Sequence, residues 1–120
     1  MTKAELNIRF IAADDESRRR GLMHASPLES SEVAFFVFPH TERHSFWNRN
    51  VSFDLSLAFL NENGVIVDIL DMAAHDERSH APSSPSKFVI EAKQGQFKSS
   101  NIAVGDIVEF DSTRNSLKIH

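Results

Sequence analysis

The chain has 120 residues, a formal net charge of −4, a pI of about 5.8 and no cysteine. This length fits one domain with a core of its own, and the absence of cysteine excludes disulfides, thiol catalysis and zinc–cysteine sites. Nucleic-acid binders usually carry a basic excess, so the acidic charge argues against that class. The longest apolar run, residues 33–38, is too short to cross a bilayer, and residues 1–6 lack the apolar segment of a secretion signal. We therefore expect one cytoplasmic domain over residues 1–120 that contacts neither membrane nor nucleic acid.

The N-terminal third is predicted to form a strand, a short helix and a buried strand. Apolar and polar residues alternate over residues 6–12, which is typical of a half-buried strand. Asp14 or Asp15 can cap a helix over about residues 14–22, with acidic residues at its start and arginines toward its end. The apolar run over residues 33–38 predicts a fully buried strand. Pro39 is expected to end this strand, because proline lacks the N–H that a central strand needs.

The rest of the chain is predicted to consist of short strands. Asn63-Gly64 lies between two apolar segments and tolerates positive φ angles, so a hairpin over about residues 55–72 is expected. A polar loop over residues 73–86 precedes a strand at 87–93, a helical turn at 95–100 and two short strands beginning near 107 and 117. The pattern predicts a mainly-β domain of coiled antiparallel sheets, a sandwich or a barrel, with one short N-terminal helix.

Residues 46–60 contain the only tryptophan and three of the ten phenylalanines. Asn48, Arg49 and Asn50 follow Trp47 and separate two apolar segments, so we interpret them as a corner between strands. Asparagine side chains bond nearby backbone in turns, and the guanidinium of Arg49 can lie over the indole. An indole beside amide and guanidinium donors is also a suitable surface for a small ligand.

Three consecutive arginines, Arg18, Arg19 and Arg20, form the most concentrated charge in the sequence. Successive positions on a helix point about 100° apart, so all three side chains cannot face one ligand. We expect a solvated helix face with one arginine turned inward.

The histidines offer only a weak metal hypothesis. His40 and His44 are four residues apart, and His75 and His80 are five apart, but both pairs fall in predicted loops. The sequence has no His-Glu-x-x-His motif. A weak site at His40 and His44 stays open, and no metal or other cofactor is expected.

No motif for nucleophilic catalysis or for nucleotide binding is present. The chain lacks both the Gly-x-Ser-x-Gly and the Gly-x-Gly-x-x-Gly patterns. Carboxylates for acid–base chemistry could come from Asp54 and Glu91, although the alternation within residues 87–93 favours a solvent-facing Glu91 beside Val89.

The order of these segments resembles the family called domain of unknown function 192. The matching segments are residues 16–23, residues 36–38, Phe46-Trp47-Asn48-Arg49-Asn50, Asn63-Gly64, residues 88–92 with Gly95, and Gly105-Asp106. The resemblance covers about residues 5–111. It implies a compact, mostly-β domain with a short helix and no assigned activity. Members often carry a secretion signal, and this sequence shows none.

The resemblance also has departures. The family usually has Trp-Met-Lys-Asn-Thr followed by Pro-Leu-Asp, whereas this chain has Asn48 and Val51 in place of Met and Thr. Asp54 and Ser56 stand near the expected Pro and Asp. The positions carried over are Arg18, Gly21, Trp47, Asn50 and Asp106. We expect them to hold the helix against the corner and any pocket to open there.

The sequence thus favours a small non-enzymatic domain that binds a small molecule, a peptide or a protein, with no catalytic residue. The predicted ligand-binding residues are Arg18, Trp47, Arg49, Asn50 and Asp54. The alternative is a hydrolase or carbohydrate-active module that uses Asp54 and Glu91 beside a Trp47 platform. That alternative predicts two carboxyl groups about 5–10 Å apart in one cleft.

Overall fold

Seven strands and two short helices make up the protein in the computed structural model, which describes residues 1–120. In chain order they are β1 (Ala4–Ala12), α1 (Asp15–Arg20), β2 (Glu32–Glu42), β3 (Leu55–Leu60), β4 (Ile66–Met72), β5 (Ser86–Lys93), α2 (Gln96–Ser99), β6 (Val108–Asp111) and β7 (Ser116–Ile119). Neither helix has the length or the apolar character needed to cross a membrane. The predicted mainly-β domain with a short N-terminal helix is confirmed.

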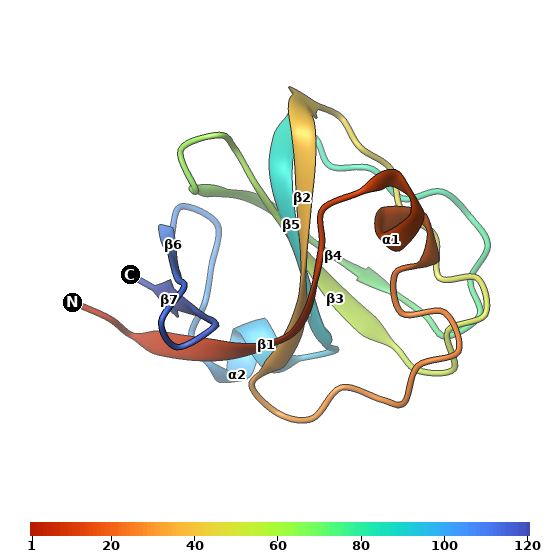
Figure 1. Ribbon diagram of the computed structural model, residues 1–120, viewed down its shortest axis with the longest axis horizontal. Coiled ribbons are helices and arrows are strands. Elements are labelled where there is room, and N and C mark those ends of the chain that lie inside the picture. The colour runs from red at the N-terminus through yellow and green to blue at the C-terminus, as the bar shows by residue number, and fades with distance from the viewer.

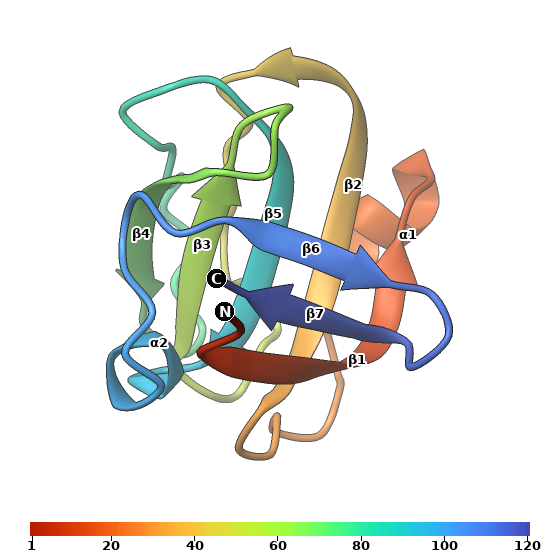
Figure 2. The ribbon, with the colours of Figure 1, turned by 90° about the vertical axis from the view of Figure 1, so that its left-hand side faces the viewer.

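The strands form one curled sheet, a half-barrel, in the order β4-β3-β5-β2-β1-β7-β6. Figure 1 shows β2 and β5 in the middle, with α1 on one side and β6 and β7 on the other. In Figure 2, β1, β6 and β7 cross in front of β2, β3 and β5. The two outer strands, β4 and β6, approach each other at one end. There Val65 and Ile107, the residues just before these strands, form an antiparallel bridge.

The pairing is antiparallel as predicted, except between β1 and β2, which run parallel. The chain between these two strands passes through α1 and returns along residues 21–31 before β2 begins. A connection of this length allows a parallel crossover, which a tight turn cannot make.

Two hydrophobic clusters cover the two faces of the central strands. The cluster inside the curl includes Ile8, Phe35 and Ile90, and the cluster on the other face includes Phe36, Leu57 and Val89. All six residues of β3 are buried, because both of its faces are covered. The second cluster also includes Leu22 after α1 and Val51 of the corner, and it is this face that holds the candidate site.

Local predictions agree with the structure where short-range chemistry decides. Asp14 caps α1 by accepting a hydrogen bond of 2.7 Å from the Ser17 amide. The predicted hairpin is confirmed, with β3 and β4 antiparallel. The predicted end of the second strand at Pro39 is wrong, since β2 continues to Glu42. Pairing with β5 is interrupted between Val37 and Glu42, so no ladder hydrogen bond is required of Pro39.

Gly64 closes the hairpin turn in a conformation that only glycine adopts easily. Its φ is +80°, and a Cβ there would lie 2.8 Å from the Val108 carbonyl oxygen. We expect Gly64→Ala to lower the free energy of unfolding by about 2–3 kcal/mol, from backbone strain and this clash. Urea denaturation measures the effect, with Gly95→Ala as the control.

The control separates the two causes. Gly95 has a φ of +88° and no atom within 4 Å of an added Cβ. Gly95→Ala should therefore show the cost of the left-handed conformation alone, about 1 kcal/mol. Equal losses in the two variants would contradict the clash with Val108.

Candidate ligand-binding cavity

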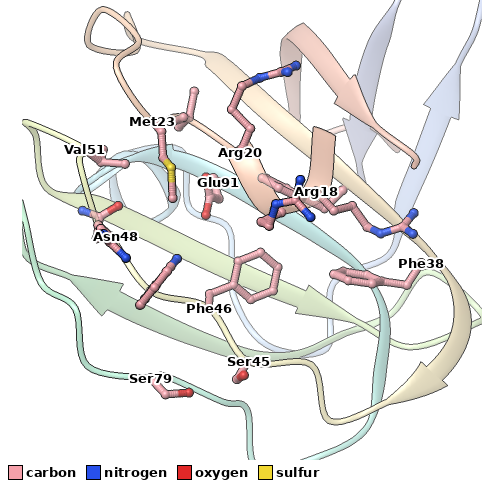
Figure 3. Close-up of a pocket in the computed structure, with 16 residues that line it drawn as sticks. Arg18, Arg20, Met23, Phe38, Ser45, Phe46, Asn48, Val51, Ser79 and Glu91 are labelled. Carbon is pink, nitrogen blue, oxygen red and sulfur yellow. The ribbon is translucent and has the colours of Figure 1, made fainter. Parts of the chain in front are cut away.

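A cavity of about 390 Å³ opens between α1 and the corner around Trp47. Its walls come from five parts of the chain: the end of α1 with the residues that follow, β2, the corner, the loop before β5, and β5 itself. The lining residues are residues 18–23, Phe36, Phe38, residues 45–49, Val51, Ser79 and Glu91. Figure 3 shows the side chains of α1 above the opening and Phe46 below it.

The sequence predicted that one of the three arginines turns inward, and in the structure this residue is Arg18. Its side chain is only 12% exposed and donates to the Val37 carbonyl oxygen at 2.8 Å and to the Asp15 carboxylate at 2.7 Å. The guanidinium also lies 5.4 Å from the centre of the Phe38 ring. Because both terminal nitrogens of its guanidinium are hydrogen-bonded within the protein, Arg18 holds α1 against β2 and forms part of the wall.

Arg19 and Arg20 leave more of their donors free. Arg19 is exposed and makes no side-chain hydrogen bond to the protein, and Arg20 makes only a 3.8 Å ion pair with Glu16. Both also line an adjoining hollow of about 370 Å³, together with Glu16, Met23, Trp47, Arg49 and Asn50. The two hollows share five residues, so the arginines stand where one meets the other.

The corner places an exposed indole at the mouth. Trp47 is 43% exposed, and the Arg49 guanidinium lies 5.3 Å from the centre of its ring, as the sequence predicted. Asn50 adopts a left-handed φ of +58°, and its carbonyl accepts from the His24 amide at 2.9 Å. The corner is thus bonded to the segment after α1, which agrees with the expected joint between helix and corner.

Asn48 fixes the corner from inside and is fully buried. Its Nδ2 donates to the carbonyl oxygens of Phe53 at 3.1 Å and Ala73 at 2.9 Å. Its backbone amide donates to the Asp76 carbonyl at 2.7 Å. The Oδ1 atom has no hydrogen-bond partner, although the residue lines the cavity.

Glu91 contributes a carboxyl group to the inner wall. It lies in β5 between Ala34 of β2 and Leu57 of β3, is 4% exposed, and forms no hydrogen bond or ion pair with the protein. The expectation of a solvent-facing Glu91 is wrong, because β5 is paired on both edges and covered on both faces. Burial raises the pKa of Glu91 to about 8, so the carboxyl is mostly neutral at pH 7.

Asp54, the fifth predicted ligand residue, does not line either hollow. It is exposed, and its Oδ1 accepts from the Ala74 amide at 2.8 Å. The structure therefore brings Arg18, Trp47, Arg49 and Asn50 around the cavity and its mouth, and leaves Asp54 outside. Of the two carboxylates suggested for catalysis, only Glu91 reaches the cavity.

Other residues singled out in the sequence have local roles. His44 stacks on Phe38 with ring centres 3.6 Å apart, and its Nε2 contacts the His40 carbonyl oxygen at 2.9 Å. Asp106 lies far along the chain and binds the Lys3 ammonium at 2.9 Å. Burial opposes ionisation of Asp106, but hydrogen bonds from Lys3 and the Ala103 amide lower its pKa overall.

Sequence reasoning did not select Arg19, Arg20, Met23 or Asn48 as site residues. One signal was available for Asn48, since it stands where the corner departs from the usual Trp-Met-Lys-Asn-Thr pattern. Val51, the other departure in that segment, also lines the cavity. For Met23 the signal was its place in the matching segment 16–23, but its position in the cavity wall depends on the path of the chain after α1.

The model of DUF192, described as an uncharacterized ACR, matches residues 2–110. The chain belongs to the DUF192 family. No curated protein matches it. A crystal structure of a protein of unknown function from Novosphingobium aromaticivorans is similar, with a TM-score of 0.80, 25% identity, and coverage of 85% of this chain and 74% of that one. A "putative transcription regulator" from Sinorhizobium meliloti shares the fold, with a TM-score of 0.81, 22% identity, and coverage of 91% and 95%. DUF192 is described as uncharacterized, and neither similar structure is described by an enzyme activity.

Proposed function

We propose that this DUF192 protein binds a small organic anion in the cavity between α1 and the Trp47 corner, without transforming it. The observation that carries this proposal is the grouping of Arg19, Arg20 and Arg49 around one opening beside an exposed indole. Guanidinium groups bind carboxylates and phosphates through paired hydrogen bonds, and an indole provides a flat apolar surface.

The local charge supports an anionic ligand, although the whole chain is acidic. Four arginines line the main cavity, and the only acidic residue there is Glu91, whose raised pKa keeps it mostly neutral at pH 7. Glu16 is the only acidic residue of the adjoining hollow. An anion that enters therefore meets an excess of positive charge in a partly enclosed space, where charge interactions are stronger than in bulk water.

The size of the cavity supports a small ligand. A volume of about 390 Å³ lies near the lower end of the range for small-molecule sites, about 300–1,000 Å³. Phe36, Phe46 and Met23 supply apolar wall for a flat body. The acidic net charge supports our expectation that nucleic acid is not a partner.

The hydrolase alternative has less support. It requires two carboxyl groups in one cleft, and Asp54 does not line the cavity that contains Glu91. We therefore propose that Glu91 contributes to binding and assign no catalytic residue.

Binding can be followed through Trp47, because the chain has one tryptophan and no tyrosine. We expect benzoate and phenyl phosphate to change the Trp47 fluorescence with saturation, and neutral benzamide to do so only weakly. Arg19→Gln and Arg20→Gln should each weaken benzoate binding by about tenfold, since each removes a charged hydrogen-bond donor.

A matched control is available in Arg114, an exposed arginine on the loop between β6 and β7 that pairs with Glu5 at 2.8 Å. Arg114→Gln makes the same change in net charge away from the cavity and should leave benzoate binding unchanged. Equal weakening in all three variants would show a general charge effect and would contradict a site at the arginines. Failure of both anions to bind would contradict the proposed function.

A further inference from the structure

The inner wall of the cavity contains a buried carboxyl group that the protein itself does not use. Glu91 is 4% exposed and has no hydrogen-bond partner among the protein groups. Buried polar groups are almost always hydrogen-bonded in native proteins, and the exceptions often mark functional positions. In Figure 3 the Glu91 carboxyl lies within the ring of lining side chains, between Met23 and the arginines of α1.

The neutral form of this carboxyl offers two complementary groups side by side. Its O–H donates one hydrogen bond and its carbonyl oxygen accepts another. The charged groups that line the cavity are Arg18, Arg19, Arg20 and Arg49, and Glu91 forms an ion pair with none of them. The burial that raises its pKa to about 8 is thus not offset by a cationic partner.

Asn48 also lines the cavity and holds a second unused acceptor, but this Oδ1 atom exposes less than 1 Å² and so does not face the open space. The two bonds from Nδ2 to carbonyl oxygens fix the orientation of its amide, because a carbonyl can only accept. Oδ1 is therefore the atom left without a donor. Figure 3 shows this oxygen on the side of Asn48 that faces Glu91. No hydrogen bond joins the two side chains, so neither satisfies the other.

We infer that the inner wall binds an uncharged carboxamide, so that the ligand is an anion with a primary amide at the end away from its charge. The Glu91 O–H donates to the amide carbonyl, and one amide N–H donates back to the Glu91 carbonyl oxygen. This inference rests on the proposed function, because it places the charged end of the ligand at Arg19, Arg20 and Arg49.

A matched pair of ligands tests the amide directly. 4-Carbamoylbenzoate and 4-acetylbenzoate have the same charge, the same ring and nearly the same shape, and they differ in having NH₂ or CH₃ beside the carbonyl. Titration calorimetry at pH 6 should show 4-carbamoylbenzoate binding about tenfold more tightly or better, because only its NH₂ group can donate back to the Glu91 carbonyl oxygen. Benzamide, which lacks the carboxylate, should bind more weakly than 4-carbamoylbenzoate.

Two variants of Glu91 separate hydrogen bonding from shape. Glu91→Gln keeps a donor and an acceptor, so it should bind 4-carbamoylbenzoate within about threefold of the wild type. Glu91→Leu keeps the volume and removes both groups, so it should weaken binding about tenfold. Both substitutions are uncharged and suit a buried position, and thermal unfolding checks that both proteins are folded.

The outcomes distinguish this inference from the proposed function. If the two benzoates bind with equal affinity, anion binding stands and the amide site is wrong. If Glu91→Leu binds 4-carbamoylbenzoate as tightly as the wild type, Glu91 does not hold the amide and the inference is wrong. If neither benzoate binds, the proposed function fails and the inference fails with it.

Discussion

Glu91→Gln is expected to stabilise the protein at neutral and alkaline pH and to leave it nearly unchanged at acid pH. The carboxyl has an ordinary pKa of 4.5, and burial raises this to about 8 in the folded protein. Well below pH 4.5 the carboxyl is protonated in both the folded and the unfolded protein, so its ionisation does not affect the free energy of unfolding. The neutral Gln reproduces this state at every pH.

The sign follows from the protons that each state binds. Between pH 4.5 and 8 the unfolded chain releases the Glu91 proton while the folded protein retains it. Unfolding therefore releases a proton, and the free energy of unfolding of the wild type falls by about 1.4 kcal/mol per pH unit. Above pH 8 both states are ionised and the loss reaches a constant value of about 5 kcal/mol.

Urea denaturation at pH 4.5, 7 and 9 measures the effect. The stability difference between Glu91→Gln and the wild type should grow from almost zero to about 3 kcal/mol and then to about 5 kcal/mol. Glu62→Gln removes an exposed carboxylate from the turn between β3 and β4 and should show no comparable trend. A difference that is the same at all three pH values would mean that the Glu91 carboxyl does not stay protonated in the fold.

Glu91 shows the difference between features that the sequence could predict and features that it could not. The helix cap and the hairpin at Gly64 depend on neighbouring residues. The sequence predicted the hairpin and limited the cap to Asp14 or Asp15, of which the structure has Asp14. The environment of Glu91 depends on which strands lie on either side of β5 and on what covers its faces. Alternation within residues 87–93 cannot supply this, because it assumes that one face of the strand is wet.

The wrong prediction at Pro39 and the failure to predict the parallel pairing of β1 with β2 have a similar cause. A proline excludes a ladder hydrogen bond at its own position, but it does not determine whether the partner strand continues there. Pairing of β2 with β5 lapses between Val37 and Glu42, and β2 keeps its extended form. In the same way, the pairing of β1 depends on the path of residues 13–31, which no local pattern determines.

The candidate site was predictable to the extent that its chemistry is local. Trp47 and Arg49 are two residues apart, so their contact could be expected from the sequence. Asp54 was grouped with them by proximity in sequence, but its carboxylate accepts a hydrogen bond from the Ala74 amide outside the cavity. Asn48 was not among the predicted ligand-binding residues, because its two carbonyl partners and its unused oxygen are visible only in the folded chain.

Asn48 is therefore the second residue at which a large effect is expected. Asn48→Ala should lower the free energy of unfolding by about 2–4 kcal/mol, because the carbonyls of Phe53 and Ala73 lose their shared donor and a hole remains. Both carbonyls belong to segments without regular structure, and the Phe53 carbonyl has no other donor.

Asn48→Leu separates hydrogen bonding from packing. Leucine has the same number of side-chain heavy atoms and the same branching as asparagine, so it fills the hole. It donates to neither carbonyl oxygen, and Ala73 keeps only the 3.3 Å bond from the Asp76 amide. We expect Asn48→Leu to be at least as destabilising as Asn48→Ala in urea denaturation, whereas Asn63→Ala in the exposed hairpin turn should change stability by less than about 1 kcal/mol. Wild-type stability in Asn48→Leu would show that Asn48 acts only by filling space, and the hydrogen bonds to Phe53 and Ala73 would then not be what holds the Trp47 corner in place.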